Sequence, residues 1–205
     1  LSIRPGDEII NMPPSFGMYP FYAKLAGAKV VDIERGANFE IDTSSIEERI
    51  TSKTRLVILA NPNNPTGNLT PKADIKKLLD TGVNVLVDEA YYEYSGETVV
   101  PWVDNYDNLI ILRSFSKWAG LAGLRVGYGI FPAEIAEYVM RIKDPYSVNA
   151  AAQVALKHSL KRKDELFRIV DNIKTERQRL FDKLSDIEGI IPYPSSANFI
   201  LCMCS

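Results

Sequence analysis

Strand-length apolar runs alternate with helix-patterned segments along the first two thirds of this chain. The runs lie at residues 8–10, 29–33, 55–60, 83–88, 109–113 and 125–131. The segments between them include a helix that ends at Gly27, a short helix near 44–50 and a helix that opens at Thr70-Pro71. Continuous apolar strands are typical of a parallel sheet buried on both faces, and strands that alternate with helices indicate an α/β fold.

After Pro132 the pattern becomes helical, with segments at 133–143, 150–160 and 163–185, and the run from Ala197 to Cys204 is predicted to be a strand. We therefore expect one domain at 1–148, and at 149–205 linking helices and the start of a smaller α+β domain. Because the chain opens at Leu1 without a methionine and stops just after an apolar run, we expect a fragment of a longer protein that lacks the N-terminal part of the first domain.

Charge and composition exclude several classes of function. Lys and Arg total 24 against 26 Asp and Glu, so the net charge of −2 offers no field for nucleic acid or an anionic membrane. No apolar run is long enough to span a bilayer. His158 is the only histidine, so we expect neither a zinc cluster nor a histidine-activated serine. Cys202 and Cys204 are expected to be buried strand residues, which favours a reducing cytoplasm.

Polar side chains follow three of the predicted strands. Asn64 lies in the turn after strand 55–60, and Asp88 and Tyr91 lie at the end of strand 83–88. The sequence Ser-Phe-Ser-Lys at 114–117 follows strand 109–113, and Arg125 lies eight residues beyond Lys117. Ligands of open α/β sheets bind at the carboxyl ends of the strands. These residues therefore predict one binding site.

In this order and spacing, the motifs resemble those of the fold-type I aminotransferases that use pyridoxal 5′-phosphate (PLP). The resemblance implies a large domain with a mostly parallel sheet flanked by helices. It implies that Lys117 is the catalytic residue, which holds PLP as a Schiff base and moves a proton at the substrate α-carbon. Asp88 would pair with the pyridine nitrogen of the cofactor, because a buried carboxylate favours the protonated ring.

The resemblance assigns the remaining contacts to PLP as well. Tyr91 and Asn64 would donate hydrogen bonds to the phenolic oxygen of the ring. Arg125 would hold the phosphate through its forked guanidinium, and hydroxyl groups would be added by Ser114 and Ser116.

Two aromatic residues near the N-terminus complete the expected site. Phe16 matches the aromatic side chain that stacks on the cofactor ring in these enzymes. Tyr19 is expected to contact the substrate, as is Asn64.

Three longer segments resemble the histidinol-phosphate aminotransferases within this family: Gly17-Met18-Tyr19, the run at 114–125, and the run Lys-Asp-Pro-Tyr-Ser-Val-Asn at 143–149. The resemblance implies transamination between L-histidinol phosphate or imidazole-acetol phosphate and 2-oxoglutarate or glutamate, in histidine biosynthesis. It also implies a cytoplasmic homodimer whose other partners are small amino and keto substrates. The family's other phosphate-binding loop is expected before Leu1, and its substrate-binding arginines after Ser205.

Other functions remain open at this point. Threonine-phosphate decarboxylases and broad-specificity aromatic aminotransferases have closely related sequences. A transcription regulator with a PLP-binding domain is the non-enzyme alternative, and a basic helix-turn-helix domain before Leu1 would support it.

Overall fold

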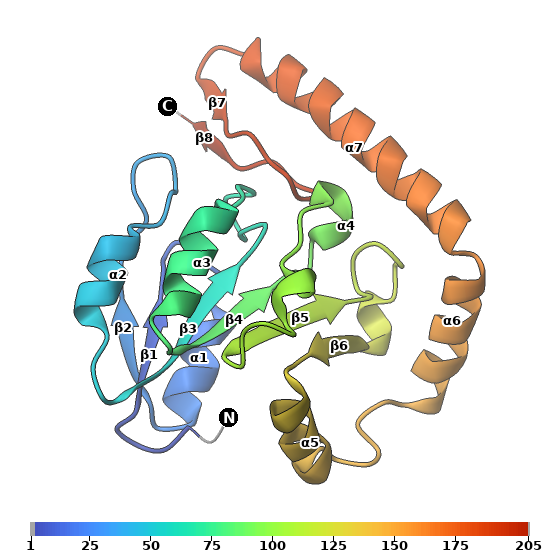
Figure 1. Cartoon of the computed structure of the whole chain (residues 1–205). Helices are drawn as coiled ribbons and strands as arrows, with labels where there is room; N and C mark the ends of the chain where they lie inside the picture. Colours follow the sequence, from blue (N-terminus) through green and yellow to red (C-terminus); the bar gives the residue numbers. More distant parts are fainter. Residues whose placement is uncertain (1–2, 205) are drawn as a thin grey trace.

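The computed structural model describes residues 3–204, and its largest element is a six-stranded sheet with the order β2-β1-β3-β4-β5-β6 (Figure 1). The strands are β1 (Glu8–Asn11), β2 (Lys29–Asp32), β3 (Thr54–Ala60), β4 (Asn84–Asp88), β5 (Leu109–Ser114) and β6 (Gly127–Ile130). The four pairings from β2 to β5 are parallel, and β6 pairs antiparallel with β5. The prediction of a mostly parallel sheet is confirmed.

Side chains that alternate along the strands build two apolar layers, one on each face of the sheet. Ile10, Val57 and Val85 pack in the layer that contains residues of α2 (Thr43–Arg49) and α3 (Lys72–Asp80). Their neighbours Ile9 and Leu56 pack on the opposite face. That face is covered by α1 (Met18–Leu25), which contributes Ala23.

The helices around the sheet start and end where the chain chemistry favours it. Asp42 caps α2 by accepting a hydrogen bond from the Ser45 amide at 3.1 Å. Gly27, with φ of +77°, follows the end of α1 in the left-handed region that glycine tolerates. The helix predicted to open at Thr70-Pro71 begins at Lys72, so Pro71 occupies the cap position.

The rest of the chain is mainly helical. The short helices α4 (Tyr92–Ser95), η1 (Val100–Trp102) and η2 (Ala122–Leu124) lie within the first 130 residues. They are followed by α5 (Ala133–Ile142), α6 (Ala150–Lys161) and α7 (Lys163–Ser185). The long helix α7 runs along one side of the molecule and ends near a two-stranded antiparallel sheet of β7 (Ile190–Pro192) and β8 (Cys202–Cys204) (Figure 1).

The C-terminal strand differs from its prediction. It starts at Cys202 rather than Ala197, and its partner β7 was not predicted. The expectation that both cysteines are buried is wrong, because Cys204 is exposed and Cys202 is half-buried on a sheet of only two strands. The boundary between 148 and 149 stays a prediction. Within residues 3–204, no helix has both the length and the apolar character needed to cross a membrane.

Candidate active site

All nine residues singled out in the sequence line one pocket of about 430 Å³ at the carboxyl ends of β3, β4 and β5. They are Phe16, Tyr19, Asn64, Asp88, Tyr91, Ser114, Ser116, Lys117 and Arg125. The parallel register explains this convergence, since Ala60 of β3 pairs with Asp88 and Asp88 pairs with Leu112 of β5. The ends of the three strands therefore lie side by side.

The turn after β3 is held by a buried asparagine that the sequence analysis did not assign. Asn63 is fully buried, and its side-chain amide donates hydrogen bonds to the Pro14 carbonyl at 3.0 Å and to Thr66 Oγ1 at 2.7 Å. Its backbone oxygen accepts from the Gly67 amide at 2.8 Å. These bonds fix the turn, so that Asn64 lines the pocket.

Asp88 is partly buried at the end of β4, and both of its carboxylate oxygens already accept a hydrogen bond. The Ala90 amide donates to Oδ1 at 3.0 Å, and the Tyr19 hydroxyl donates to Oδ2 at 2.7 Å. Burial raises the pKa of Asp88, and the two hydrogen bonds oppose that rise. This carboxylate would therefore gain from a cationic partner in the pocket.

Tyr19 was expected to contact the substrate, which stays a prediction, and in the structure its hydroxyl donates a hydrogen bond to Asp88. The pKa of Tyr19 is raised well above its usual value, first by burial and then by the charge of Asp88. The phenol therefore stays protonated and remains a hydrogen-bond donor. Its ring packs edge-on against Phe16, with 5.5 Å between the ring centroids.

A tight loop follows β5 and presents Lys117. Ser114 Oγ accepts a hydrogen bond from the Ser116 amide at 3.1 Å, and the Lys117 carbonyl accepts from the Gly120 amide at 3.3 Å. The Lys117 side chain is exposed, and its Nζ lies 5.5 Å from the centroid of the Tyr91 ring. Tyr91 is itself buried and packs edge-on against Phe199.

Arg125 occupies an unusual backbone position just before β6. Its φ is +56°, in the left-handed region where residues other than glycine are uncommon. Such a conformation costs on the order of 1–3 kcal/mol and is most often found at functional sites. Its guanidinium bonds only to the Ala122 carbonyl at 2.9 Å among the hydrogen bonds recorded for the described residues, and its side chain is exposed at the pocket.

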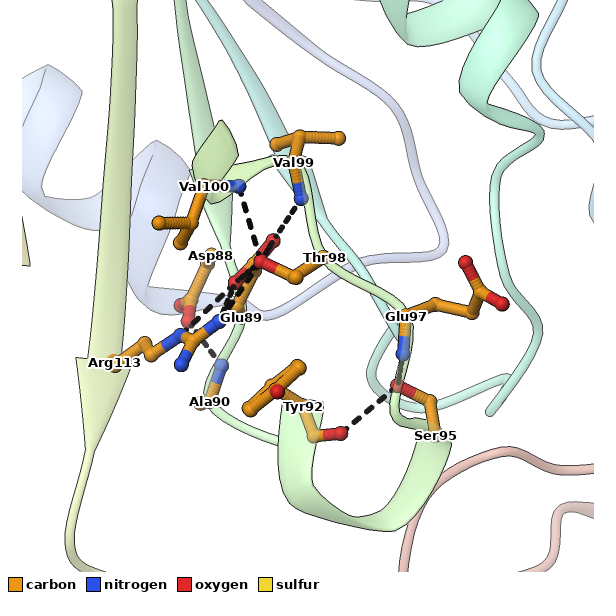
Figure 2. A network of polar contacts seen from close by, with 10 residues as sticks. All are labelled: Asp88, Glu89, Ala90, Tyr92, Ser95, Glu97, Thr98, Val99, Val100 and Arg113. Atoms are coloured by element: carbon orange, nitrogen blue, oxygen red, sulfur yellow. Dashed lines mark hydrogen bonds and ion pairs between the residues drawn. The ribbon is translucent and has the colours of Figure 1, made fainter. Parts of the chain in front are cut away.

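A buried ion pair beside the pocket, whose Arg113 also lines it, was missed by sequence reasoning. Glu89 follows Asp88 in the chain and is fully buried, and its carboxylate accepts hydrogen bonds from Arg113, from the Thr98 hydroxyl and from the Val99 amide. Figure 2 shows Arg113 reaching across from β5 to this carboxylate. The sequence contained one signal for this pair. Glu89 is adjacent to Asp88, so its side chain points to the opposite side of the extended chain, and Arg113 lies on the next strand.

The donors and charges of the pocket fit PLP. Arg125 and the hydroxyls of Ser114 and Ser116 suit a phosphate, and the amine of Lys117 suits an aldehyde. The carboxylate of Asp88 suits a protonated ring nitrogen. A volume of about 430 Å³ lies in the range of sites for molecules of this size.

Comparisons with known proteins agree with this chemistry. The family model described as aminotransferase class I and II matches residues 1–204. A histidinol-phosphate aminotransferase of Dehalococcoides mccartyi (strain CBDB1) is 52% identical over 202 residues, which are 98% of this chain and 56% of that protein. The chain thus spans little more than half the length of this curated relative.

Two solved structures share the fold. The histidinol-phosphate aminotransferase of Clostridium acetobutylicum superposes with a TM-score of 0.89 at 31% identity, over 98% of this chain and 62% of that one. The enzyme of that name from Sinorhizobium meliloti, solved in complex with pyridoxal-5′-phosphate, also gives 0.89, at 25% identity over 99% of this chain and 57% of that one. The expected fold-type I architecture is confirmed.

Proposed function

The chain belongs to the class I and II aminotransferase family, whose members use PLP, and we propose that the whole protein transfers the amino group of L-histidinol phosphate to 2-oxoglutarate. The observation that carries this proposal is the meeting of Lys117, Asp88 and Arg125 in one pocket. The 52% identity to a histidinol-phosphate aminotransferase supports the choice of substrate. The reverse reaction, from glutamate to imidazole-acetol phosphate, follows from the same chemistry.

PLP, when bound, supplies an electron sink that lowers the cost of removing a proton from the substrate α-carbon. Arg125 would hold the phosphate through its guanidinium, and Ser114 and Ser116 would add their hydroxyls. These contacts fix one part of the cofactor, so that its ring must lie among the other residues that line the pocket.

Asp88 keeps a proton at the ring nitrogen, because a carboxylate in a partly buried site gains most from a cationic neighbour. Asn64 and Tyr91 orient the ring by donating to its phenolic oxygen, and Phe16 covers one of its faces. Burial, and next the charge of Asp88, raise the pKa of Tyr91, so its phenol remains a donor.

Lys117 has two tasks in this proposal. Its amine attaches the cofactor between turnovers. Once released, the amine accepts the proton from the substrate α-carbon and delivers it to the cofactor. The exposed position of the side chain leaves Nζ free to move between these tasks.

The assembly and location are proposed on the same basis. The whole protein acts as a homodimer in the cytoplasm, as the resemblance to the histidinol-phosphate aminotransferases implies. Residues 1–148 form the cofactor-binding domain, and 149–205 begin the smaller domain. The longer relatives leave room for the substrate-binding arginines outside this chain.

The test is a steady-state assay of the PLP-loaded whole protein with L-histidinol phosphate and 2-oxoglutarate, with glutamate as the measured product. We expect glutamate to form, with kcat/KM at least tenfold above that for phenylalanine or tyrosine as amino donor, a difference of about 1.4 kcal/mol in transition-state binding. A preference for the aromatic amino acids would support the broad-specificity alternative. Carbon dioxide released from threonine phosphate would support the decarboxylase, and bound PLP without turnover of any donor would support the regulatory domain.

A further inference from the structure

The Tyr19–Asp88 hydrogen bond joins helix α1 to the end of β4, 69 residues apart in the sequence. We propose that Tyr19 is a positioning residue that holds the Asp88 carboxylate in its ionised form and fixes the direction in which it faces the cofactor ring. The inference rests on the proposed function in one respect, since it takes the ring nitrogen of PLP as the partner of Asp88.

The geometry of the Asp88 carboxylate supports this role. One donor reaches each oxygen, Tyr19 Oη at 2.7 Å from Oδ2 and the Ala90 amide at 3.0 Å from Oδ1. Two donors on different oxygens prevent the carboxylate plane from rotating. Each oxygen keeps a second lone pair with which it can accept a hydrogen bond from a ligand in the pocket.

The Tyr19 side chain is held in place by its packing. Its ring packs edge-on against Phe16. It also packs against the apolar layer beneath α1, which includes Ala23, Leu56 and Ile58. The short helix is thus anchored on β3, and the phenol oxygen is delivered to Asp88 from a fixed base. The 2.7 Å bond would have to break before this hydroxyl could donate to a substrate.

The charged and ionisable groups around Asp88 also favour this role of Tyr19. Tyr19 and Tyr91 are the phenols that act on Asp88 or lie beside it. Three cationic side chains line the same pocket, Arg113, Lys117 and Arg125, and Arg35 acts on Tyr19. Both phenols have pKa values raised by burial first and by Asp88 second, so neither competes for the negative charge. Tyr19 is the side chain whose hydrogen bond lowers the pKa of Asp88.

The consequence concerns where one proton resides. A carboxylate and a ring nitrogen that share a proton can form a charged pair or a neutral pair. A hydrogen bond from Tyr19 to Asp88 stabilises the charged pair alone, because it is stronger to a carboxylate than to a carboxylic acid. Without the Tyr19 hydrogen bond, the cofactor ring carries less positive charge. The Lys117 nitrogen through which the cofactor is attached then holds its own proton more tightly, because the repulsion from the ring is weaker.

The experiment is a pH titration of the visible absorbance band of the holoenzyme without substrate, for wild type and Tyr19→Phe. We expect the midpoint of Tyr19→Phe to lie roughly one pH unit higher, the effect of one hydrogen bond to a charged group. We also expect kcat to fall roughly tenfold, with KM for the amino donor nearly unchanged. An unchanged midpoint overturns the proposal.

The matched control is Tyr106→Phe. The Tyr106 hydroxyl also donates to an aspartate, Asp80 Oδ1 at 3.1 Å, but it does not line the pocket. The titration midpoint of Tyr106→Phe should equal that of wild type. An upward shift of the same size in Tyr106→Phe would contradict the assignment of the effect to Asp88.

A double-mutant cycle tests whether Tyr19 acts through Asp88. In an Asp88→Asn background, Tyr19→Phe should leave the midpoint where it is, because the charged pair is already gone. A further shift of full size would mean that Tyr19 acts by another route and would overturn the proposal. If Tyr19→Phe fails to fold, 3-fluorotyrosine at position 19 replaces it, and its stronger donor should move the midpoint downward; no movement contradicts the proposal.

The titration separates this proposal from the proposed function. It uses no substrate, so a protein that binds PLP but does not act on histidinol phosphate still gives the predicted shift. A wild-type protein with no visible band after loading with PLP would contradict the cofactor assignment itself, and the Tyr19 proposal with it.

Discussion

Arg113 donates two hydrogen bonds to one oxygen of Glu89, from Nε at 3.0 Å and from Nη2 at 2.8 Å (Figure 2). Glu89 has no exposed side-chain surface, and the guanidinium also lies 3.6 Å from the centroid of the Tyr92 ring. Burial alone would lower the pKa of Arg113, but the hydrogen bonds to Glu89 raise it. Because Glu89 follows Asp88 in the chain, this ion pair holds in place the segment that carries Asp88.

Replacing Glu89 with glutamine should destabilise the protein strongly. The change leaves the Arg113 charge in a site that is only 11% exposed, and breaking one partner of a buried pair costs about 3–5 kcal/mol. Urea unfolding measures this loss. The control is Glu97→Gln, which breaks a half-exposed pair with Lys72 and should cost at most about 1 kcal/mol. Equal losses in the two variants would contradict the importance given to the buried pair.

Gly67 should not tolerate a side chain. Its φ is +75°, and a Cβ there would lie 2.3 Å from Ser195 Oγ and 3.1 Å from Ser195 Cα. Gly96 has nearly the same φ, +74°, with no atom within 4 Å of that position. Both alanine variants should therefore lose about 1–2 kcal/mol of stability, because alanine is strained at a positive φ. Gly67→Ala should lose about 1–3 kcal/mol more, because its Cβ overpacks against Ser195.

Thermal unfolding of the two glycine variants isolates the contact between the turn after β3 and the C-terminal segment. The Ser196 amide, which donates to the Gly67 carbonyl at 2.7 Å, belongs to the same contact. If Gly67→Ala and Gly96→Ala had the same melting temperature, the close approach of Ser195 to Gly67 would not exist in solution.

Glu93 should make stability depend on pH near neutrality. Burial raises its pKa to about 7, and its Oε2 has no hydrogen-bond partner among the described residues. A carboxyl group whose pKa is higher in the folded state stabilises that state fully at low pH, and this contribution disappears as the pH rises through about 7.

Wild type should therefore lose on the order of 1–2 kcal/mol more stability than Glu93→Gln between pH 5 and pH 8, once solvent screening of this partly exposed group is allowed for. Denaturant unfolding at the two pH values gives the difference. A steeper pH dependence in the glutamine variant would show that the Glu93 carboxyl is not the group that titrates.

Asp88→Asn should retain PLP but react slowly. Lys117 and Arg125 still hold the cofactor, whereas the amide cannot keep a proton on the ring nitrogen. We expect kcat to fall about 10²–10³-fold, the size seen when one fixed electrostatic group is removed. Asp74→Asn, a change at a half-buried helix residue outside the pocket that pairs with Lys77, serves as control and should keep full activity. A near-normal rate in Asp88→Asn would mean that another group protonates the ring.

The sequence predicted the sheet and the pocket residues that follow its strands because both depend on local patterns, whereas Phe16 and Tyr19 were assigned through the family resemblance. Continuous apolar runs such as 55–60 identify buried strands, and a parallel sheet brings the residues after them to one edge. Pairings between distant segments could not be predicted in this way. The bond from Tyr19 to Asp88 and the strand β7, which has only three residues and pairs with β8, depend on tertiary packing.

The Glu89 pair was missed for a different reason. Two adjacent acids at a strand end look like a polar turn, and the pattern does not show that the second acid is enclosed by Thr98, Val99 and Arg113. Only the alternation of side chains along β4 separates the acid facing the pocket from the acid facing the core.

The most direct test of the account is to locate the attachment of PLP. The holoenzyme is reduced with borohydride, digested and mapped by mass spectrometry, which marks the lysine that carries the cofactor. We predict the pyridoxyl label on the peptide that contains Lys117, and no label at this site in Lys117→Ala. A label on any other lysine of wild type would contradict the assignment of this pocket as the active site.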